Sequence, residues 1–312
     1  MRFVIVGPGA LGSVLGASLA DAGHDVAFLG RRSPHLEALR KDGVLLTTRQ
    51  GERKRVHIEA TDDPAAAARA DAIVVLVKSG DTIAAMAAIA PHIQPGHIVL
   101  TLQNGLGNAE RIRAALGDGS RVLPGTTSQA ATRVGPGEVV HTGEGPTLIG
   151  YVDPVDAPVA AKLARVLSAA GWSTAATADI ATWLWRKAAI NAAINGLTAL
   201  AGVANGAIAA NPDLLDSAEL IAEEAASVAR AQGIELGGMR RAMLETAAAT
   251  ADNRSSMLQD MDAGRRTEVE AIHGAILAAG LDAGIDTPAI RVLAALIRAK
   301  ERQFERTAND DE

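Results

Sequence analysis

The chain has 312 residues, 48% hydrophobic and 21% charged, so it can bury a sizeable core, and its length suggests about two domains. Its net charge of −6 and its aromatic share of 2% argue against a nucleic-acid-binding protein, which needs a basic surface and stacking aromatic side chains. Cysteine is absent, which excludes a thiol nucleophile, disulfides and a cysteine-ligated metal, and we expect no metal site. The apolar stretches are too short to span a bilayer and no leader is recognised, so we expect a cytoplasmic protein.

A glycine-rich loop follows the first predicted strand. The apolar run 2–6 precedes a G-x-G-x-x-G pattern, and a helical segment from about 10 to 22 and a second strand at 25–29 follow it. Such a loop brings backbone N–H groups and the positive end of a helix against a pyrophosphate. The pattern therefore predicts a dinucleotide site; a tight turn whose glycines serve packing alone is the alternative. The loop consists of Gly7, Pro8, Gly9, Ala10, Leu11 and Gly12.

Two arginines follow the second strand. An NAD-binding site usually has Asp or Glu there to bind the ribose 2'-hydroxyl, whereas this chain has Arg31 and Arg32. Two guanidinium groups suit a 2'-phosphate, so the sequence favours NADP over NAD. A solvated basic turn is the alternative, for Arg32 in particular.

The first half of the chain alternates short strands with helical patterns. This alternation predicts an α/β fold with a doubly wound, largely parallel Rossmann-type sheet in a domain covering residues 1–178. Residues 138–141 and 147–150 resemble a hairpin that extends this sheet. Residues 179–312 show helical periodicity and are predicted to form a second, all-helical domain that ends in a solvated tail at 309–312. Further strands are expected at 44–47, 57–60, 72–77, 98–103, 122–126 and 173–176, and a helix at about 155–171.

Polar residues follow two of the predicted strands. In α/β sheets the ligand lies beyond the carboxyl ends of the strands, where Lys78 and Asn104 are expected. Lys78 suits a phosphate or a substrate charge, or else ends its strand in solvent. Asn104 suits a ribose or carboxamide, or else only turns the chain ahead of Gly105.

The second domain opens with a polar stripe. Lys187, Asn191 and Asn195 recur every four residues among apolar neighbours, so they share one face of a helix. Buried asparagines need hydrogen-bond partners, which a stripe facing a ligand would find. A partly buried lysine with a lowered pKa is a candidate general acid. The alternative is an exposed polar helix face.

A third polar cluster lies between 252 and 270. Ser255 either caps a helix or donates to a carboxylate. Thr267 and Glu270 fit a capping box, which would give Glu270 a structural role. Glu268 suits the first turn of the same helix through the helix dipole, even without a catalytic role.

Taken together, these motifs resemble the ketopantoate reductases, NADPH-dependent enzymes of pantothenate synthesis. The resemblance covers nearly the whole chain. It rests on G-x-G-A-x-G at 7–12, V-K-S at 77–79, Q-N-G at 103–105, W-x-K-x-x-x-N-x-x-x-N-x-L-T-A at 185–199, and S-S-M-L-Q-D with G-R-x-T-E within 255–268.

The resemblance implies roles for individual residues. Lys187 would protonate the C2 carbonyl oxygen as hydride arrives from NADPH, and Glu268 would lie near the lysine and the nicotinamide ribose. The cofactor would contact the glycine loop, Arg31, Lys78, Asn104, Ala130 and Glu268. The substrate would contact Asn104, Asn191, Asn195, Asn205 and Ser255.

The resemblance implies a substrate as well as a chemistry. It implies reduction of 2-dehydropantoate (ketopantoate) to (R)-pantoate, with the reduction of another branched 2-oxo acid as the first alternative. A non-enzymatic dinucleotide sensor on the same fold is a further alternative. Asn205 precedes a glycine, a pair common in turns without function. The apolar helices after residue 270 are compatible with a homodimer.

Overall fold

The computed structural model describes residues 1–117 and 120–310. The chain forms two compact units. The sheet unit comprises Met1–Gln103 and Asn108–Ile180, and the helical unit comprises Asn104–Gly107 and Ala181–Glu312. A four-residue segment from the middle of the sheet unit therefore belongs to the helical unit.

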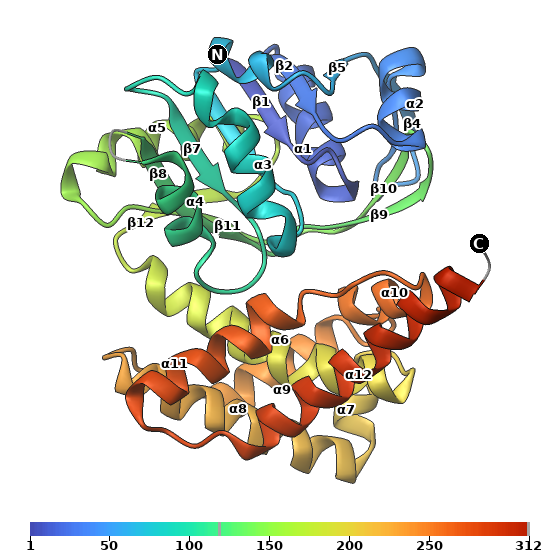
Figure 1. The fold of residues 1–312 in the computed structure, drawn as a ribbon, viewed down its shortest axis with the longest axis vertical. Helices are drawn as coiled ribbons and strands as arrows, with labels where there is room; N and C mark the ends of the chain where they lie inside the picture. The colour runs from blue at the N-terminus through green and yellow to red at the C-terminus, as the bar shows by residue number, and fades with distance from the viewer. Residues whose placement is uncertain (118–119, 311–312) are drawn as a thin grey trace. The chain divides into compact units, whose positions relative to one another are not determined.

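An eight-stranded sheet forms the centre of the sheet unit, which is coloured blue to green in Figure 1. Every neighbouring pair is parallel except β11 (Thr147–Gly150) with β8 (Arg121–Thr127), which confirms the predicted doubly wound α/β fold. The glycine loop directly follows β1 (Arg2–Val6), an inner strand of the sheet. In order across the sheet the strands are β12 (Thr174–Thr177), β11 (Thr147–Gly150), β8 (Arg121–Thr127), β7 (Ile98–Thr101), β6 (Ala72–Val75), β1 (Arg2–Val6), β2 (Asp25–Leu29) and β5 (Glu59–Thr61).

Helices cover both faces of this sheet because successive strand residues point to opposite sides. Phe3 and Ile5 pack with α1 (Ala10–Asp21) and α5 (Ala157–Ala169), whereas Val4 and Val6 pack with α3 (Thr82–Ile89) and α4 (Asn108–Leu116). The inner strands are apolar on both faces, as buried parallel strands require. Helix α2 (Pro34–Asp42) and the short helices η1 (Pro64–Arg69), η2 (Ser79–Asp81), η3 (Ala90–His92) and η4 (Pro154–Asp156) complete the connections.

A second, four-stranded sheet corrects one prediction. Its order is β4 (Arg53–Val56), β3 (Val44–Thr47), β10 (Glu138–Gly143) and β9 (Ala130–Gly135). The predicted hairpin of 138–141 with 147–150 is wrong, because β10 pairs with β9 and β3 while β11 pairs with β8 and β12. Local pattern could not separate the two pairings, since both segments are short alternating strands flanked by glycine. The strand β4, whose sequence is Arg-Lys-Arg-Val, was also missed.

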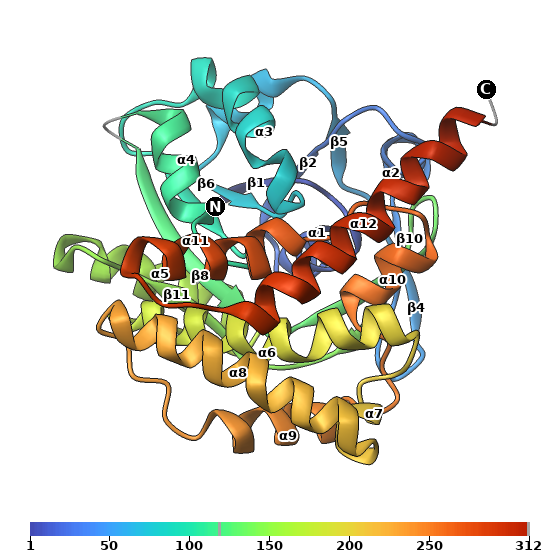
Figure 2. The same ribbon diagram turned by 60° about the horizontal axis from the view of Figure 1, so that its bottom comes forward.

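The helical unit is built around α6 (Ile180–Ala201), which Figure 2 shows in yellow-green among the yellow-to-red helices. Ala188, Ala189, Ala192 and Ala193 of α6 are buried, and such small residues allow neighbouring helices to pack closely. All the described elements of residues 181–310 are helical, as predicted. They are α7 (Ala207–Ala210), α8 (Pro212–Ala231), α9 (Met239–Ala249), α10 (Ser256–Asp262), the π-helical turn η5 (Glu270–Gly274), α11 (Ala275–Ala283) and α12 (Pro288–Asp310).

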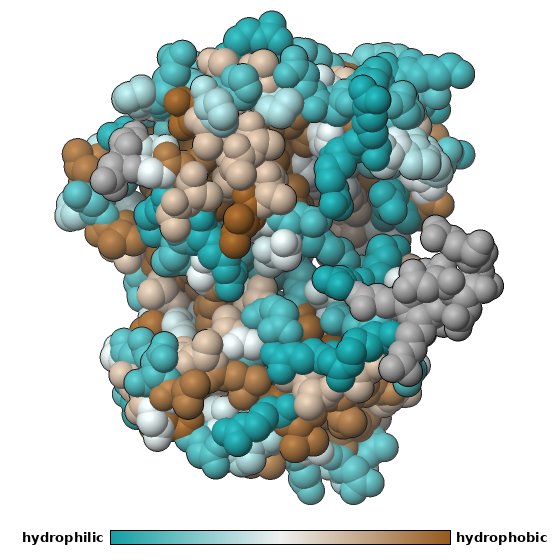
Figure 3. Space-filling view, viewed as in Figure 1, coloured by the Kyte–Doolittle hydropathy of each residue, from teal (hydrophilic) through white to brown (hydrophobic). Residues whose placement is uncertain are grey.

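The surface of the helical unit has an apolar strip. In Figure 3, brown atoms gather over α11 and the first half of α12, and Leu281 is 82% exposed, Val292 61% and Leu296 53%. No helix in the described part of the chain is both long and apolar enough to cross a membrane. The expected tail is corrected in part, since α12 continues to Asp310, and residues 311 and 312 lie outside the described residues.

Candidate active site

The three glycines of the loop after β1 differ in what surrounds them. Gly7 has φ +92°, and a Cβ there would lie 2.5 Å from the Val77 nitrogen. A Cβ on Gly12 would collide with the Gly7 carbonyl oxygen. A Cβ on Gly9 would meet no atom of the described residues within 4 Å, and Gly9 is also the N-cap of α1, where no side chain caps the helix. The loop therefore leaves open space in front of uncapped N–H groups, which fits a pyrophosphate.

The arginine loop, which contains Arg31 and Arg32, follows β2, the strand beside β1. Arg31 forms an ion pair with Asp81 at 3.1 Å, and Arg32 forms one with Asp62 at 2.5 Å. Both guanidinium groups are more than four-fifths exposed, so a 2'-phosphate could replace or join these carboxylates.

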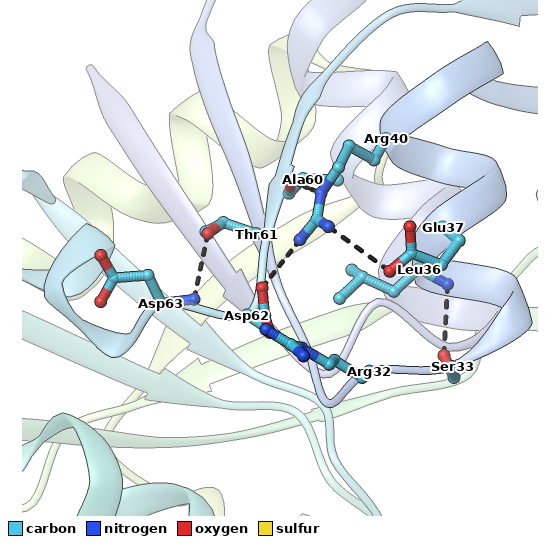
Figure 4. A network of polar contacts seen from close by, with 9 residues as sticks. All are labelled: Arg32, Ser33, Leu36, Glu37, Arg40, Ala60, Thr61, Asp62 and Asp63. Atoms are coloured by element: carbon cyan, nitrogen blue, oxygen red, sulfur yellow. Dashed lines mark hydrogen bonds and ion pairs between the residues drawn. The ribbon is translucent and has the colours of Figure 1, made fainter.

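Asp62 connects the arginine loop to α2 (Figure 4). Arg40 donates to Asp62 at 2.8 Å and to the Ala60 carbonyl at 3.1 Å. The hydrogen bonds from Arg32 and Arg40 lower the pKa of Asp62 to about 2, so it stays ionised. Ser33 caps α2 by accepting from the Leu36 N–H. The network holds the arginine loop at the start of α2.

The segments that follow β6 and β7 are joined by Gln103, a residue with no role in the sequence-based prediction. The Gln103 amide donates to the Val77 carbonyl at 2.8 Å and to the Thr82 hydroxyl at 2.7 Å. Lys78 follows Val77 directly, at the sheet edge where the glycine loop also lies. The signal in the sequence that could have found this contact was a glutamine directly after an apolar strand, because a buried amide must be hydrogen-bonded.

Asn104–Gly107 packs against η5 of the helical unit. The Leu106 N–H donates to the Ala271 carbonyl at 2.9 Å. Gly105 has φ +90°, and a Cβ there would collide with the same carbonyl. Gly105 thus permits both the turn and the close approach that place Asn104.

Asn104 lies between the two charged residues predicted to be catalytic. Lys187 Nζ donates to Asn104 Oδ1 at 2.8 Å, and Asn104 Nδ2 donates to Glu268 Oε2 at 3.1 Å. Lys187 comes from α6 and Glu268 from the segment leading into η5, so three distant parts of the sequence meet here. The ribose or carboxamide contact expected of Asn104 stays a prediction.

The ammonium of Lys187 has a lowered pKa. Burial lowers the pKa of Lys187 from its usual 10.5 to about 8, and the negative charge of Glu268 opposes this by raising it. An ammonium with a pKa near neutral pH gives up its proton more readily than an ordinary lysine.

The two asparagines of the α6 stripe are at least partly buried. Asn191 is partly buried and Asn195 is 8% exposed, and neither side chain hydrogen-bonds to any described residue. An amide in such a position favours a ligand that supplies the missing partners.

Ser255 and Asn205 lie further along the helical unit. Ser255 caps α10 by accepting from the Leu258 N–H at 3.2 Å, and its Oγ lies 2.9 Å from the Thr198 hydroxyl of α6. Asn205 donates to the Thr250 hydroxyl at 2.9 Å, while its buried Oδ1 has no partner among the described residues. Ser255 therefore has a structural contact, which leaves a substrate contact open.

Two other expectations had different outcomes. The capping box is wrong, because the Glu270 carboxylate binds Arg298 at 2.6 and 2.8 Å and lies in a π-helical turn. Ala130 begins β9 in the four-stranded sheet, and its cofactor contact stays a prediction. The described residues contain no cluster of three or more His, Asp or Glu side chains that could hold a metal ion.

A nucleotide-type glycine loop on a doubly wound sheet, and a lysine with a lowered pKa in a separate helical unit, define a dinucleotide-dependent oxidoreductase. Comparison with known proteins gives the family. Residues 3–154 match the family model described as ketopantoate reductase PanE/ApbA, and residues 179–301 match its C-terminal model. The chain belongs to the ketopantoate reductase family.

Individual relatives match along nearly the whole chain. A 2-dehydropantoate 2-reductase from Halobacterium salinarum is 42% identical over 97% of this chain and 99% of its own length. The crystal structure of a PanE/ApbA family ketopantoate reductase from Ralstonia eutropha has 32% identity and a TM-score of 0.90, covering 98% of this chain and all of the other. The structure of D-mandelate dehydrogenase with NADH and anilino(oxo)acetate has 26% identity and a TM-score of 0.92, covering 98% and 99% of the two chains.

Proposed function

We propose that this protein is an NADPH-dependent 2-dehydropantoate 2-reductase, which forms (R)-pantoate for pantothenate and coenzyme A synthesis. The observation that carries the proposal is Asn104 bridging the Lys187 ammonium and the Glu268 carboxylate. The curated relatives named 2-dehydropantoate 2-reductase support the choice of substrate.

The two predicted domains, residues 1–178 and 179–312, would have different roles in this reaction. The first domain would bind NADPH through the glycine loop, Arg31, Lys78 and Ala130. The second would bind the oxo acid and supply the proton. Asn104, which belongs to the helical unit although it follows β7, would serve both ligands.

The proton would come from Lys187. NADPH, when bound, supplies the hydride that adds to C2 of the substrate. Negative charge then builds on the C2 oxygen, where the Lys187 ammonium stabilises it and donates a proton. Asn104 Oδ1 accepts a hydrogen bond from the ammonium and so orients it. The negative charge of Glu268 raises the pKa of Lys187, which keeps the lysine protonated before the transfer.

Uncharged polar groups would recognise the substrate. Asn191 and Asn195 would orient its carbonyl and hydroxyl groups, and the Ser255 hydroxyl would donate to its carboxylate. The buried acceptor Asn205 Oδ1, unpaired among the described residues, suits the hydroxymethyl group that distinguishes ketopantoate from plain branched acids.

Reduction of another 2-oxo acid is the alternative. The structural match with D-mandelate dehydrogenase favours it, since that structure holds anilino(oxo)acetate and NADH. A hydrophobic pocket separates neighbouring alkyl groups by only about 1–3 kcal/mol per methylene, so the fold alone does not choose the substrate.

The test is NADPH oxidation with ketopantoate and, in parallel, with 2-oxoisovalerate, which lacks the hydroxymethyl group. We expect kcat/KM to be several hundredfold higher for ketopantoate, because a site built for a hydroxyl leaves polar groups unpaired with the plain acid. Equal rates would keep the reductase and overturn the substrate. The same preference in Asn205→Ala would show that another residue reads the hydroxyl.

The homodimer and the cytoplasmic location stay predictions. The exposed apolar strip on α11 and α12 is compatible with a dimer. The molar mass in solution, 32.0 kDa for one chain, distinguishes a monomer from a dimer.

A further inference from the structure

A buried polar chain links the glycine loop to α2 and to the second sheet. Ser13, in the first turns of α1, and His35, in the first turn of α2, are 0% and 5% exposed. Ser13 Oγ lies 3.1 Å from the Pro8 carbonyl oxygen and 3.3 Å from His35 Nε2. His35 Nδ1 lies 2.9 Å from the Gly137 nitrogen, in the turn between β9 and β10.

The donors and acceptors allow one direction along this chain. The Gly137 N–H donates to Nδ1 of His35, so the ring proton must be on Nε2. Nε2 then donates to Ser13 Oγ, and the Ser13 hydroxyl donates to the Pro8 carbonyl. The neutral ring that this requires is favoured because burial, with the nearby positive charge of Arg133, lowers the pKa of His35.

At one end, this series of hydrogen bonds holds the Pro8 carbonyl on the buried side of the glycine loop. Pro8 itself has no N–H, so its carbonyl is the backbone group by which this residue can be anchored. On the outer side is Gly9, with open space at its Cα. Because this hydrogen bond holds Pro8 from the buried side, Gly9 and the start of α1 lie toward the open side.

At the other end, the same series of hydrogen bonds holds the start of α2. His35 follows Ser33, the N-cap of α2, and Ser33 directly follows the arginine loop. The two loops are also adjacent, because a Cβ on Gly30 would lie 3.0 Å from Pro8 Cδ. Ser13 thus contacts the glycine loop, and His35 lies in the first turn of α2, which directly follows the arginine loop and the N-cap Ser33.

We propose that Ser13 and His35 form a positioning pair that sets the glycine loop and the arginine loop relative to each other for NADPH binding. The inference rests on the proposed function, because it concerns the dinucleotide that this function requires. Neither residue contacts substrate in this scheme, so their loss weakens NADPH binding and leaves recognition of the oxo acid unchanged.

The test measures the Kd for NADPH by nicotinamide fluorescence, together with KM for ketopantoate and the unfolding midpoint. We expect Ser13→Ala to raise the Kd about five- to tenfold, the size expected for one buried hydrogen bond. Ser18→Ala is the matched control, since Ser18 is also on α1 but accepts from Trp172 Nε1. Its Kd should stay at the wild-type value.

Two substitutions at His35 separate positioning from general stability. The His35→Gln amide nitrogen reaches the place of Nε2 and can still donate to Ser13, so NADPH affinity should be largely retained. The His35→Asn oxygen reaches only the place of Nδ1, so it keeps the Gly137 contact and should lose affinity as Ser13→Ala does.

The outcomes distinguish this inference from the proposed function. NADPH binding by the wild type with equal Kd values for Ser13→Ala, His35→Asn and Ser18→Ala would overturn the positioning role alone. A Kd that follows the unfolding midpoint in all variants would also overturn it. A wild type that binds no dinucleotide would overturn the proposed function and the inference with it.

Discussion

At the scale of single residues, the negative charge of Glu268 raises the pKa of Lys187 against the lowering effect of burial. The general acid must be protonated, so kcat should be constant below the Lys187 pKa of about 8 and fall about tenfold per pH unit above it. Glu268 raises that pKa, so Glu268→Gln should move the alkaline limb of the kcat profile down by about one unit. The Kd for NADPH at pH 7 is measured alongside to separate this effect from cofactor binding. An unmoved limb would show that another group sets it.

Arg31 gives a prediction about cofactor choice. A charged hydrogen bond to the 2'-phosphate is present only with NADPH, so Arg31→Ala should raise KM for NADPH about ten- to hundredfold and leave KM for NADH nearly unchanged. Arg241→Ala is the control, because Arg241 is 84% exposed and paired with Glu245 as Arg31 is 85% exposed and paired with Asp81. Equal losses with both cofactors would contradict a 2'-phosphate contact at Arg31.

At the scale of elements, the Asn104–Gly107 segment depends on its glycine. Gly105→Ala would place a methyl group in a backbone conformation that costs about 1–3 kcal/mol and against the Ala271 carbonyl. We expect a lower unfolding midpoint and a fall in kcat of about tenfold or more, because Asn104 moves away from Lys187.

Gly233→Ala provides the matched comparison for this substitution. Gly233 has φ +77° and no atom of the described residues within 4 Å of an added Cβ, so the variant has the strain without the collision. Stability should fall while kcat stays at the wild-type value. If both variants lose kcat equally, the position of Asn104 is not what Gly105 determines.

At the scale of the whole molecule, buried His273 makes stability depend on pH. Burial lowers the pKa of His273 to about 4, and its Nε2 lies 3.1 Å from the Ala192 carbonyl of α6. The unfolded chain binds a proton near pH 6.5 that the folded chain does not bind until about pH 4. The free energy of unfolding should therefore fall by about 3 kcal/mol as pH drops through this window.

The variant His273→Gln isolates this contribution. Its amide can still donate to Ala192 but cannot be protonated, so the loss of stability between pH 6.5 and 4 should be about 3 kcal/mol smaller than in the wild type. Urea titrations at several pH values measure the difference. Parallel curves for the two proteins would mean that other groups cause the acid sensitivity.

Much of the fold follows from the sequence by local physics. The glycine loop, the apolar inner strands and the periodicity of α6 each predict an element from neighbouring residues, and the doubly wound sheet with a helical region follows from their order. The spacing of Lys187, Asn191 and Asn195 likewise determines that they share one helix face, because helix geometry is the same in every protein.

Which distant segments meet is known only from the folded structure. Residues 138–143 and 147–150 have similar patterns but pair in different sheets, since pairing depends on partners far along the chain. The contact of Asn104 with Lys187 and Glu268 joins residues 83 and 164 positions away. The lowered pKa of Lys187 is likewise a property of the folded chain, because burial removes water from a charge in a way that no local sequence pattern specifies.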